Sequence, residues 1–144
     1  MNVLMDIIDV AIYSSIGIVL MVLGNFLIDL IIPCSFPEEI KKGNKSVGFV
    51  SAGTNIGVGL LLKAAISSPS VASAAKESLA GGIVSSLLYF AVGIVFFMVG
   101  YIVIDKLNRQ YKLNDEIGNG NTAAGIMVAG IFIGLAIVIS GVIM

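Results

Sequence analysis

Four long apolar stretches, each without a charge or a proline near its centre, constrain this chain more than any other feature. They cover roughly 10–32, 46–66, 80–104 and 121–143. A helix needs about 20 residues to cross the hydrocarbon core of a bilayer, and its backbone groups must be paired within the segment. Only 12% of the 144 residues are charged, whereas soluble domains have about a quarter. The sequence therefore predicts an all-α, polytopic protein with four transmembrane helices in a single membrane domain, 1–144.

Acidic residues precede the first stretch. A secretory signal opens with basic residues, whereas this chain offers Asp6 and Asp9. We therefore expect the first stretch to remain as a permanent span.

The basic residues predict which way the helices run. Linkers 33–45 and 105–120 together contain six basic residues. The linker between the second and third spans, counted with the end of the second span, contains two. The six are Lys41, Lys42, Lys45, Lys106, Arg109 and Lys112, and the two are Lys63 and Lys76. Because short basic loops stay in the cytoplasm, we expect both linkers to be cytoplasmic and both termini to lie outside.

The two halves of the chain have similar sequences. Residues 13–29 match 89–105 at seven of seventeen positions, and 43–57 match 120–134 at seven of fifteen. This predicts two tandem helical hairpin repeats, about 10–66 and 80–143. Each repeat contains an even number of spans, so both are expected to enter the bilayer in the same direction.

Repeated glycines in the second and fourth spans predict close helix packing. Helices in lipid associate largely through small residues that let their backbones approach. We expect these two spans to form the central pair, and their small faces favour a homo-oligomer. The predicted packing residues are Gly48, Gly53, Gly57, Gly125, Gly130 and Gly134.

The motif Asn-x-[Ser/Ala/Thr]-[Ala/Val]-Gly enters the second span at 44–48 and the fourth at 121–125. With this doubled motif the chain resembles the bacterial family known as domain of unknown function 350. The resemblance covers nearly all 144 residues. It implies a multi-pass protein of the bacterial inner (plasma) membrane. It also suggests an envelope role beside a membrane-stress protein as partner, and it carries over no catalytic residue.

Asn44 and Asn121 stand just before the second and fourth spans. Asparagine caps helix N-termini, and capping is sufficient to explain both residues. The alternative is an anionic phospholipid headgroup held at the two helix N-termini. In that interpretation Lys41 and Lys42 bind the anionic headgroup together with the two asparagines.

Asp29 and Asp105 occupy equivalent positions near the ends of the first and third spans. The C-terminal end of a helix dipole is negative, so a carboxylate there does not stabilise the helix. Two interpretations stay open, a structural salt bridge or interface residue and a proton or cation site. Asn25 and Asn55 join them as ligand or ion candidates, although such residues more often link helices through hydrogen bonds.

Composition excludes several function classes. Histidine is absent and there is one cysteine, so we expect no catalytic group, no metal site and no cofactor. A net charge of −1 predicts no nucleic-acid partner. We expect a self-associating structural or envelope-stress component with a cytoplasmic partner. The alternative is a small oligomeric channel or transporter for an ion or small solute.

Overall fold

The computed structural model describes residues 3–108 and 110–144, with the side chains of Pro69 and Glu77 outside the description. Arg109, counted above among the basic linker residues, lies outside the described residues. The described residues form helices without strands, in the order α1 (Val3–Asp29), α2 (Phe36–Lys41), α3 (Lys45–Ser67), α4 (Pro69–Glu77), α5 (Leu79–Leu107), α6 (Leu113–Gly118) and α7 (Thr122–Ile143).

Four of these helices are long and apolar enough to cross a membrane, as predicted: α1, α3, α5 and α7. The largest difference from the sequence prediction is at α1, which begins at Val3 rather than near residue 10. Asp6 lies in its first turn, where a negative charge stabilises the positive end of the helix dipole. The acidic residues that precede the apolar stretch are therefore part of the helix.

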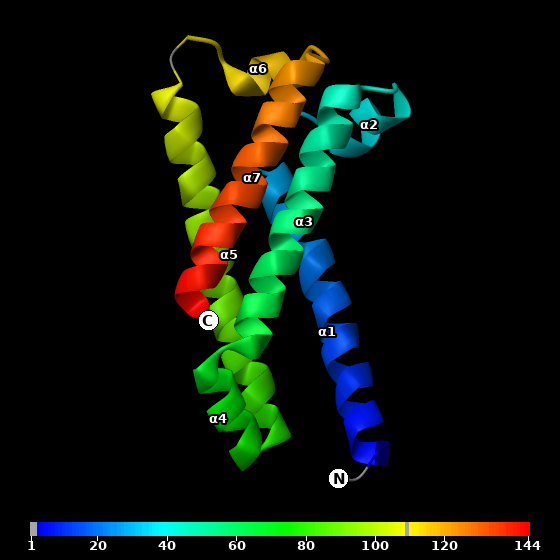
Figure 1. The fold of residues 1–144 in the computed structure, drawn as a ribbon. Coiled ribbons are helices and arrows are strands. Elements are labelled where there is room, and N and C mark those ends of the chain that lie inside the picture. The colour runs from blue at the N-terminus through cyan, green and yellow to red at the C-terminus, as the bar shows by residue number, and fades with distance from the viewer. Residues whose placement is uncertain (1–2, 109) are drawn as a thin grey trace.

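The four long helices alternate in direction, so that α1 and α5 run toward one end of the bundle whereas α3 and α7 run back toward the other (Figure 1). The short helices α2 and α6 lie together at one end of the bundle, and α4 lies at the other. We call these the linker end and the α4 end. The tandem duplication of the chain stays a prediction.

The second and fourth spans, α3 and α7, make the most extensive helix contact of the bundle. Half of the α3 span is buried against its neighbours, compared with 6% of α1. A Cβ atom added at Gly53 would lie 2.5 Å from Ala129 Cα, and one at Gly125 would lie 2.6 Å from Ser46 Cα. At Gly57 it would lie 2.7 Å from the Phe97 ring. Glycine at these three positions lets the helices approach closely.

The packing prediction is wrong for the other three glycines within the chain. A Cβ added at Gly48, Gly130 or Gly134 would meet nothing within 4 Å. A helix touches a given neighbouring helix along only one of its faces. Successive residues of a helix point about 100° apart, so two adjacent residues do not lie on the same face. Once α7 presents Ala129 to Gly53, its neighbour Gly130 points outward.

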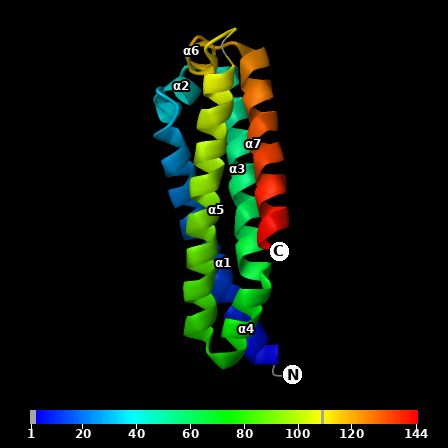
Figure 2. The ribbon, with the colours of Figure 1, turned by 90° about the vertical axis from the view of Figure 1, so that its left-hand side faces the viewer.

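The segment between α3 and α5 forms the helix α4. The hydroxyl of Ser68 accepts the N–H of Val71 at 3.3 Å and so caps α4. Ser78 caps α5 in the same way, through Gly81 at 3.0 Å. α4 packs against the start of α5 and extends beyond the level at which α7 ends (Figure 2).

Candidate functional site

Two elbows of the same build form the linker end. Each consists of a short helix, a glycine with positive φ and an asparagine that opens a long helix; they span residues 36–44 and 113–121. Gly43 has φ +78° and Gly120 has φ +81°, a conformation that glycine adopts without a steric penalty. The N–H of Asn44 donates to Glu39 O at 2.9 Å, and that of Asn121 to Glu116 O at 3.0 Å. Both elbows thus end in the hydrogen-bond pattern of a glycine C-cap.

The capping role of the two asparagines is confirmed. Asn44 Oδ1 accepts the N–H of Val47 at 3.3 Å, and Asn121 Oδ1 accepts that of Ala123 at 3.1 Å. Their amide groups donate in turn to a glutamate of the same elbow, Glu39 at 2.9 Å and Glu116 at 2.7 Å. These glutamates were not among the predicted site residues, although their equivalent positions in the two predicted repeats were a usable signal.

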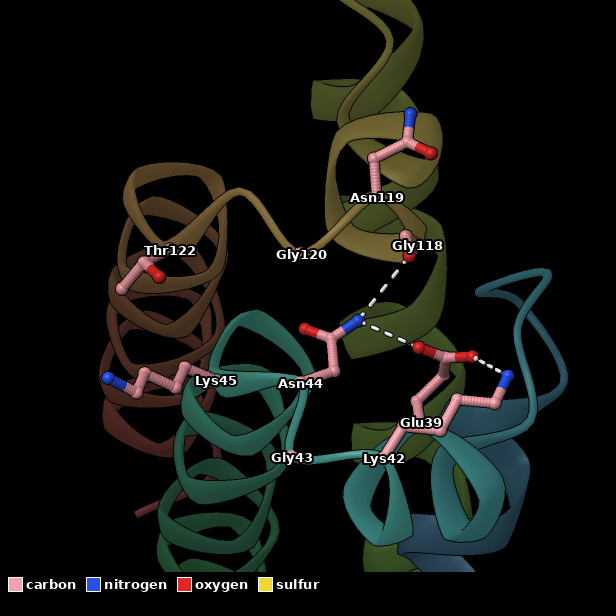
Figure 3. Close-up of a pocket in the computed structure, with 9 residues that line it drawn as sticks. All are labelled: Glu39, Lys42, Gly43, Asn44, Lys45, Gly118, Asn119, Gly120 and Thr122. Atoms are coloured by element: carbon pink, nitrogen blue, oxygen red, sulfur yellow. Dashed lines mark hydrogen bonds and ion pairs between the residues drawn. The ribbon is translucent and has the colours of Figure 1, made fainter.

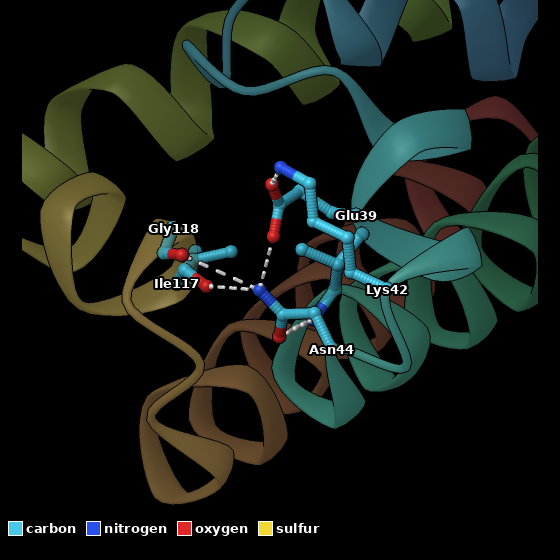
Figure 4. A network of polar contacts seen from close by, with 6 residues as sticks. Glu39, Lys42, Asn44, Ile117 and Gly118 are labelled. Carbon is cyan, nitrogen blue, oxygen red and sulfur yellow. Dashed lines mark hydrogen bonds and ion pairs between the residues drawn. The ribbon is translucent and has the colours of Figure 1, made fainter.

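The first elbow also contacts the second. Asn44 Nδ2 lies 3.2 Å from Ile117 O and 3.4 Å from Gly118 O (Figure 4). A pocket of about 350 Å³ lies between the elbows. Figure 3 shows Asn44 pointing across it, from the start of α3 toward Gly118. Among the described residues Asn121 makes no equivalent cross-contact, and its amide group donates to Glu116 of its own elbow.

Charges at this junction are neutralised inside the first elbow. Lys42 Nζ lies 2.7 Å from Glu39 Oε1. Hydrogen bonds from Asn44 and Lys42 lower the pKa of Glu39, and the hydrogen bond and charge of Glu39 raise the pKa of Lys42. Lys41 is exposed and does not line the pocket. Of the four headgroup candidates, three are thus engaged in caps or an ion pair, and the geometry favours capping over an anion site.

The two equivalent aspartates have different surroundings. Asp105 accepts a long hydrogen bond from Asn114 Nδ2 at 3.4 Å, and Asn114 Oδ1 accepts the hydroxyl of Tyr101 at 2.9 Å. Within the described residues Asp29 has neither a hydrogen bond nor an ion pair. Neither aspartate forms a salt bridge in that part of the chain.

Polar side chains join α1 to α3 inside the bundle. Asn25 Nδ2 donates to Met21 O at 2.8 Å and to Asn55 Oδ1 at 3.0 Å. Asn55 Nδ2 donates to Ser51 O at 2.8 Å. The predicted helix-linking role of Asn25 and Asn55 is therefore confirmed.

These groups line a pocket of about 420 Å³, which we call the α1–α3 pocket. The structure brings three of the four ligand candidates, Asn25, Asp29 and Asn55, to this pocket, and places Asp105 elsewhere. Ser51 also lines it. The remaining walls are apolar and come from α1 and from α2, where Phe36 and Ile40 take part.

Comparison with known families gives a double match. The sequence model of the family described as Domain of Unknown Function (DUF350) matches residues 2–79 and again residues 78–144. The chain belongs to this family. Each match contains one pair of long helices and one elbow.

Two relatives are labelled as transmembrane proteins. The UPF0719 transmembrane protein of Aquifex aeolicus is 30% identical over 128 residues, which is 88% of this chain and 46% of the relative. This chain thus spans about half the length of that relative. The UPF0719 transmembrane protein YshE of Bacillus subtilis is 24% identical over 135 residues, 94% of this chain and 92% of the relative. No solved structure matches the chain.

Proposed function

We propose that this protein is a non-enzymatic, self-associating component of the membrane. The observation that carries the proposal is the set of glycines on the long helices that have no close neighbour among the described residues. On α3 and α7 an added Cβ would meet no atom within 4 Å at five such positions: Gly48, Gly59, Gly130, Gly134 and Gly141.

A glycine costs a helix interior about 1 kcal/mol relative to alanine. Five outward-facing glycines therefore cost on the order of 4–5 kcal/mol if they only face lipid. Close contact with another helix can offset that cost, because small residues admit a second backbone. A second copy of this chain is the partner that the repeated small faces fit best.

The elbows supply the surface for a further partner. The first elbow carries the exposed Lys41 and Lys42 beside Glu38 and Glu39, and the exposed Lys45 follows it at the start of α3. If basic loops face the cytoplasm here, as in most membrane proteins, the linker end is available to a cytoplasmic protein. A membrane-stress protein is the partner that the family resemblance suggests, in the bacterial inner membrane.

The oligomeric mass of the purified protein in mild detergent tests self-association. We expect a dimer or larger assembly for the wild type and a shift toward monomer for Gly130→Leu with Gly134→Leu. Gly17→Leu on α1 is the matched control, since Gly17 also has open space around it but lies outside the α3–α7 pair. A monomeric wild type, or equal effects of the two substitutions, would contradict the proposal.

Transport is the second candidate function, and the α1–α3 pocket favours it. The pocket provides polar groups on one pair of helices, whereas on the other pair the residues equivalent to Asn25 and Asn55 are the aromatic Tyr101 and Phe132. A route across the bilayer would need polar groups from several subunits. If an ion or small solute enters liposomes that contain the wild-type protein, and Asp29→Asn abolishes this flux, transport would be favoured over the structural role.

A further inference from the structure

The α1–α3 pocket is open to the surface of the bundle, and its polar residues come from α1 and α3. Asn25 and Asp29 stand one helical turn apart on α1, and Ser51 and Asn55 stand one turn apart on α3, so each pair shares a helix face. Asn55 lies ten residues beyond the start of α3 at Lys45, about 15 Å along the axis.

Counting donors and acceptors shows what the pocket lacks. Both hydrogens of Asn25 Nδ2 are used, by Met21 O and Asn55 Oδ1, and one hydrogen of Asn55 Nδ2 is used by Ser51 O. In the described chain the Asp29 carboxylate, Asn25 Oδ1 and the Ser51 hydroxyl have no partner. What remains is mostly oxygen acceptors with one carboxylate. Such a set is complementary to a cation that donates hydrogen bonds.

The second half of the chain shows the same place filled. Tyr101, Val128 and Phe132 stand where the first half has Asn25, Ser51 and Asn55, and the rings of Tyr101 and Phe132 lie 4.8 Å apart. Phe132 is fully buried and Tyr101 is 1% exposed. One hairpin therefore closes this space with aromatic rings, whereas the other leaves it open and polar.

The partner of the carboxylate differs in the same way. Asp105 accepts from Asn114, and the residue equivalent to Asn114 in the first half is Pro37. Proline has no side-chain donor and no backbone N–H. Asp29 consequently faces a pocket without the donor that its equivalent has.

The size and walls of the pocket indicate the kind of cation. A volume of about 420 Å³ is many times the roughly 30 Å³ that one water occupies in the liquid, and it lies in the range of small-molecule sites. Val22, Phe26 and Ile40 add apolar walls, and Phe26 is 57% exposed. An aromatic face attracts an ammonium group. A bare metal ion would leave most of this space and these walls unused.

We propose that the α1–α3 pocket binds a monovalent organic cation, an ammonium group on an apolar body. Asp29 is its counter-ion, Asn25 and Ser51 supply hydrogen-bond acceptors, and Phe26 provides an apolar wall. This binding activity goes beyond the proposed self-association and does not depend on it.

Titration calorimetry of the full chain in detergent with benzylammonium tests the proposal at neutral pH. We expect saturable binding by the wild type and none of the neutral isostere benzyl alcohol. Asp29→Asn, which keeps the shape and removes the charge, should weaken binding about tenfold or more. Asp105→Asn is the matched control and should bind within about twofold of the wild type, because Asp105 does not line the pocket.

A second variant installs the residues of the other hairpin. Ser51→Val with Asn55→Phe should fill the pocket and abolish benzylammonium binding, with the folded state checked by thermal unfolding. If that variant does not fold, the isosteric Asp29→Asn variant still tests whether the pocket binds benzylammonium through the Asp29 charge. Absence of saturable wild-type binding, wild-type affinity in Asp29→Asn, or equal losses in Asp29→Asn and Asp105→Asn would overturn the proposal. So would a sodium ion signal in ²³Na NMR that benzylammonium fails to displace.

Discussion

At the scale of single residues, the two elbow asparagines show how one local motif acquires two tertiary roles. Both cap a long helix and bind a glutamate of their own elbow. Asn44 in addition donates to Ile117 O of the other elbow. The cross-contact ties the start of α3 to the end of α6.

We expect Asn121→Ala to destabilise the protein by about 1 kcal/mol, the usual cost of a lost cap. Asn44→Ala should cost about 2 kcal/mol, because the carbonyl groups of the second elbow also lose a donor. Denaturant unfolding in mixed micelles measures both. Asn119→Ala is the control, since Asn119 is exposed and lines the same pocket. Equal losses for the two caps would show that the elbow contact contributes nothing.

The ion pair at Glu39 makes the first elbow sensitive to acid. Hydrogen bonds from Asn44 and Lys42 place the folded-state pKa of Glu39 below its ordinary value of 4.5. A lowered pKa means that the stabilisation is complete above that value and is lost as the pH falls through the folded-state pKa. Glu39→Gln should therefore flatten the fall in stability below about pH 4.5. Unfolding midpoints from neutral to acidic pH measure this, with Glu38→Gln as the exposed neighbour for comparison.

At the scale of helices, the contact between α3 and α7 uses glycines unequally. Gly53 faces the backbone of Ala129, whereas Gly130 faces open space. These two glycines occupy equivalent positions in the sequence, 77 residues apart. The helix pair is thus asymmetric even though the two sequences are similar.

Alanine substitutions separate the two environments. Gly53→Ala should destabilise the bundle by about 1–3 kcal/mol, since its methyl group would have to push α7 away. Gly130→Ala should stabilise an isolated protomer by up to about 1 kcal/mol through helix propensity, while it weakens self-association. Unfolding and oligomeric mass, measured on the same samples, report both effects. A destabilised Gly130→Ala monomer would show that α7 packs differently.

At the scale of the whole molecule, the charges divide between the two ends. Lys41, Lys42 and Lys45 lie at the linker end, whereas Lys76 lies on α4. The preference of basic loops for the cytoplasm predicts that the linker end faces inward.

Cysteine labelling in intact cells tests this orientation. On a Cys34→Ser background, Ala72→Cys should react with a membrane-impermeant maleimide added outside. Gln110→Cys should react only after the cells are opened. Both positions are exposed, so differences in labelling report the side of the membrane. Labelling of both from outside would overturn the topology.

Much of the architecture could be predicted from local features. The four spans follow from the length and hydrophobicity of each stretch, because lipid requires every backbone group to be paired within its own helix. The caps at Asn44 and Asn121 follow from residue type and position alone. The α4 helix is not among the predicted elements, since its short, mixed sequence is compatible with several conformations.

The remaining features depend on how the helices are rotated against one another. α3 and α7 each offer more than one small face, and the sequence does not rank contacts of nearly equal energy. The tertiary structure selects Gly53, Gly57 and Gly125 for close packing and turns their counterparts outward. It likewise separates the two aspartates, because the neighbour at Asp105 is Asn114 and the equivalent neighbour at Asp29 is a proline. The sequence by itself thus determined the spans and their caps, which are local, whereas the rotation and packing of the helices decided which repeated glycines meet a neighbouring backbone and which polar residues come together at one pocket.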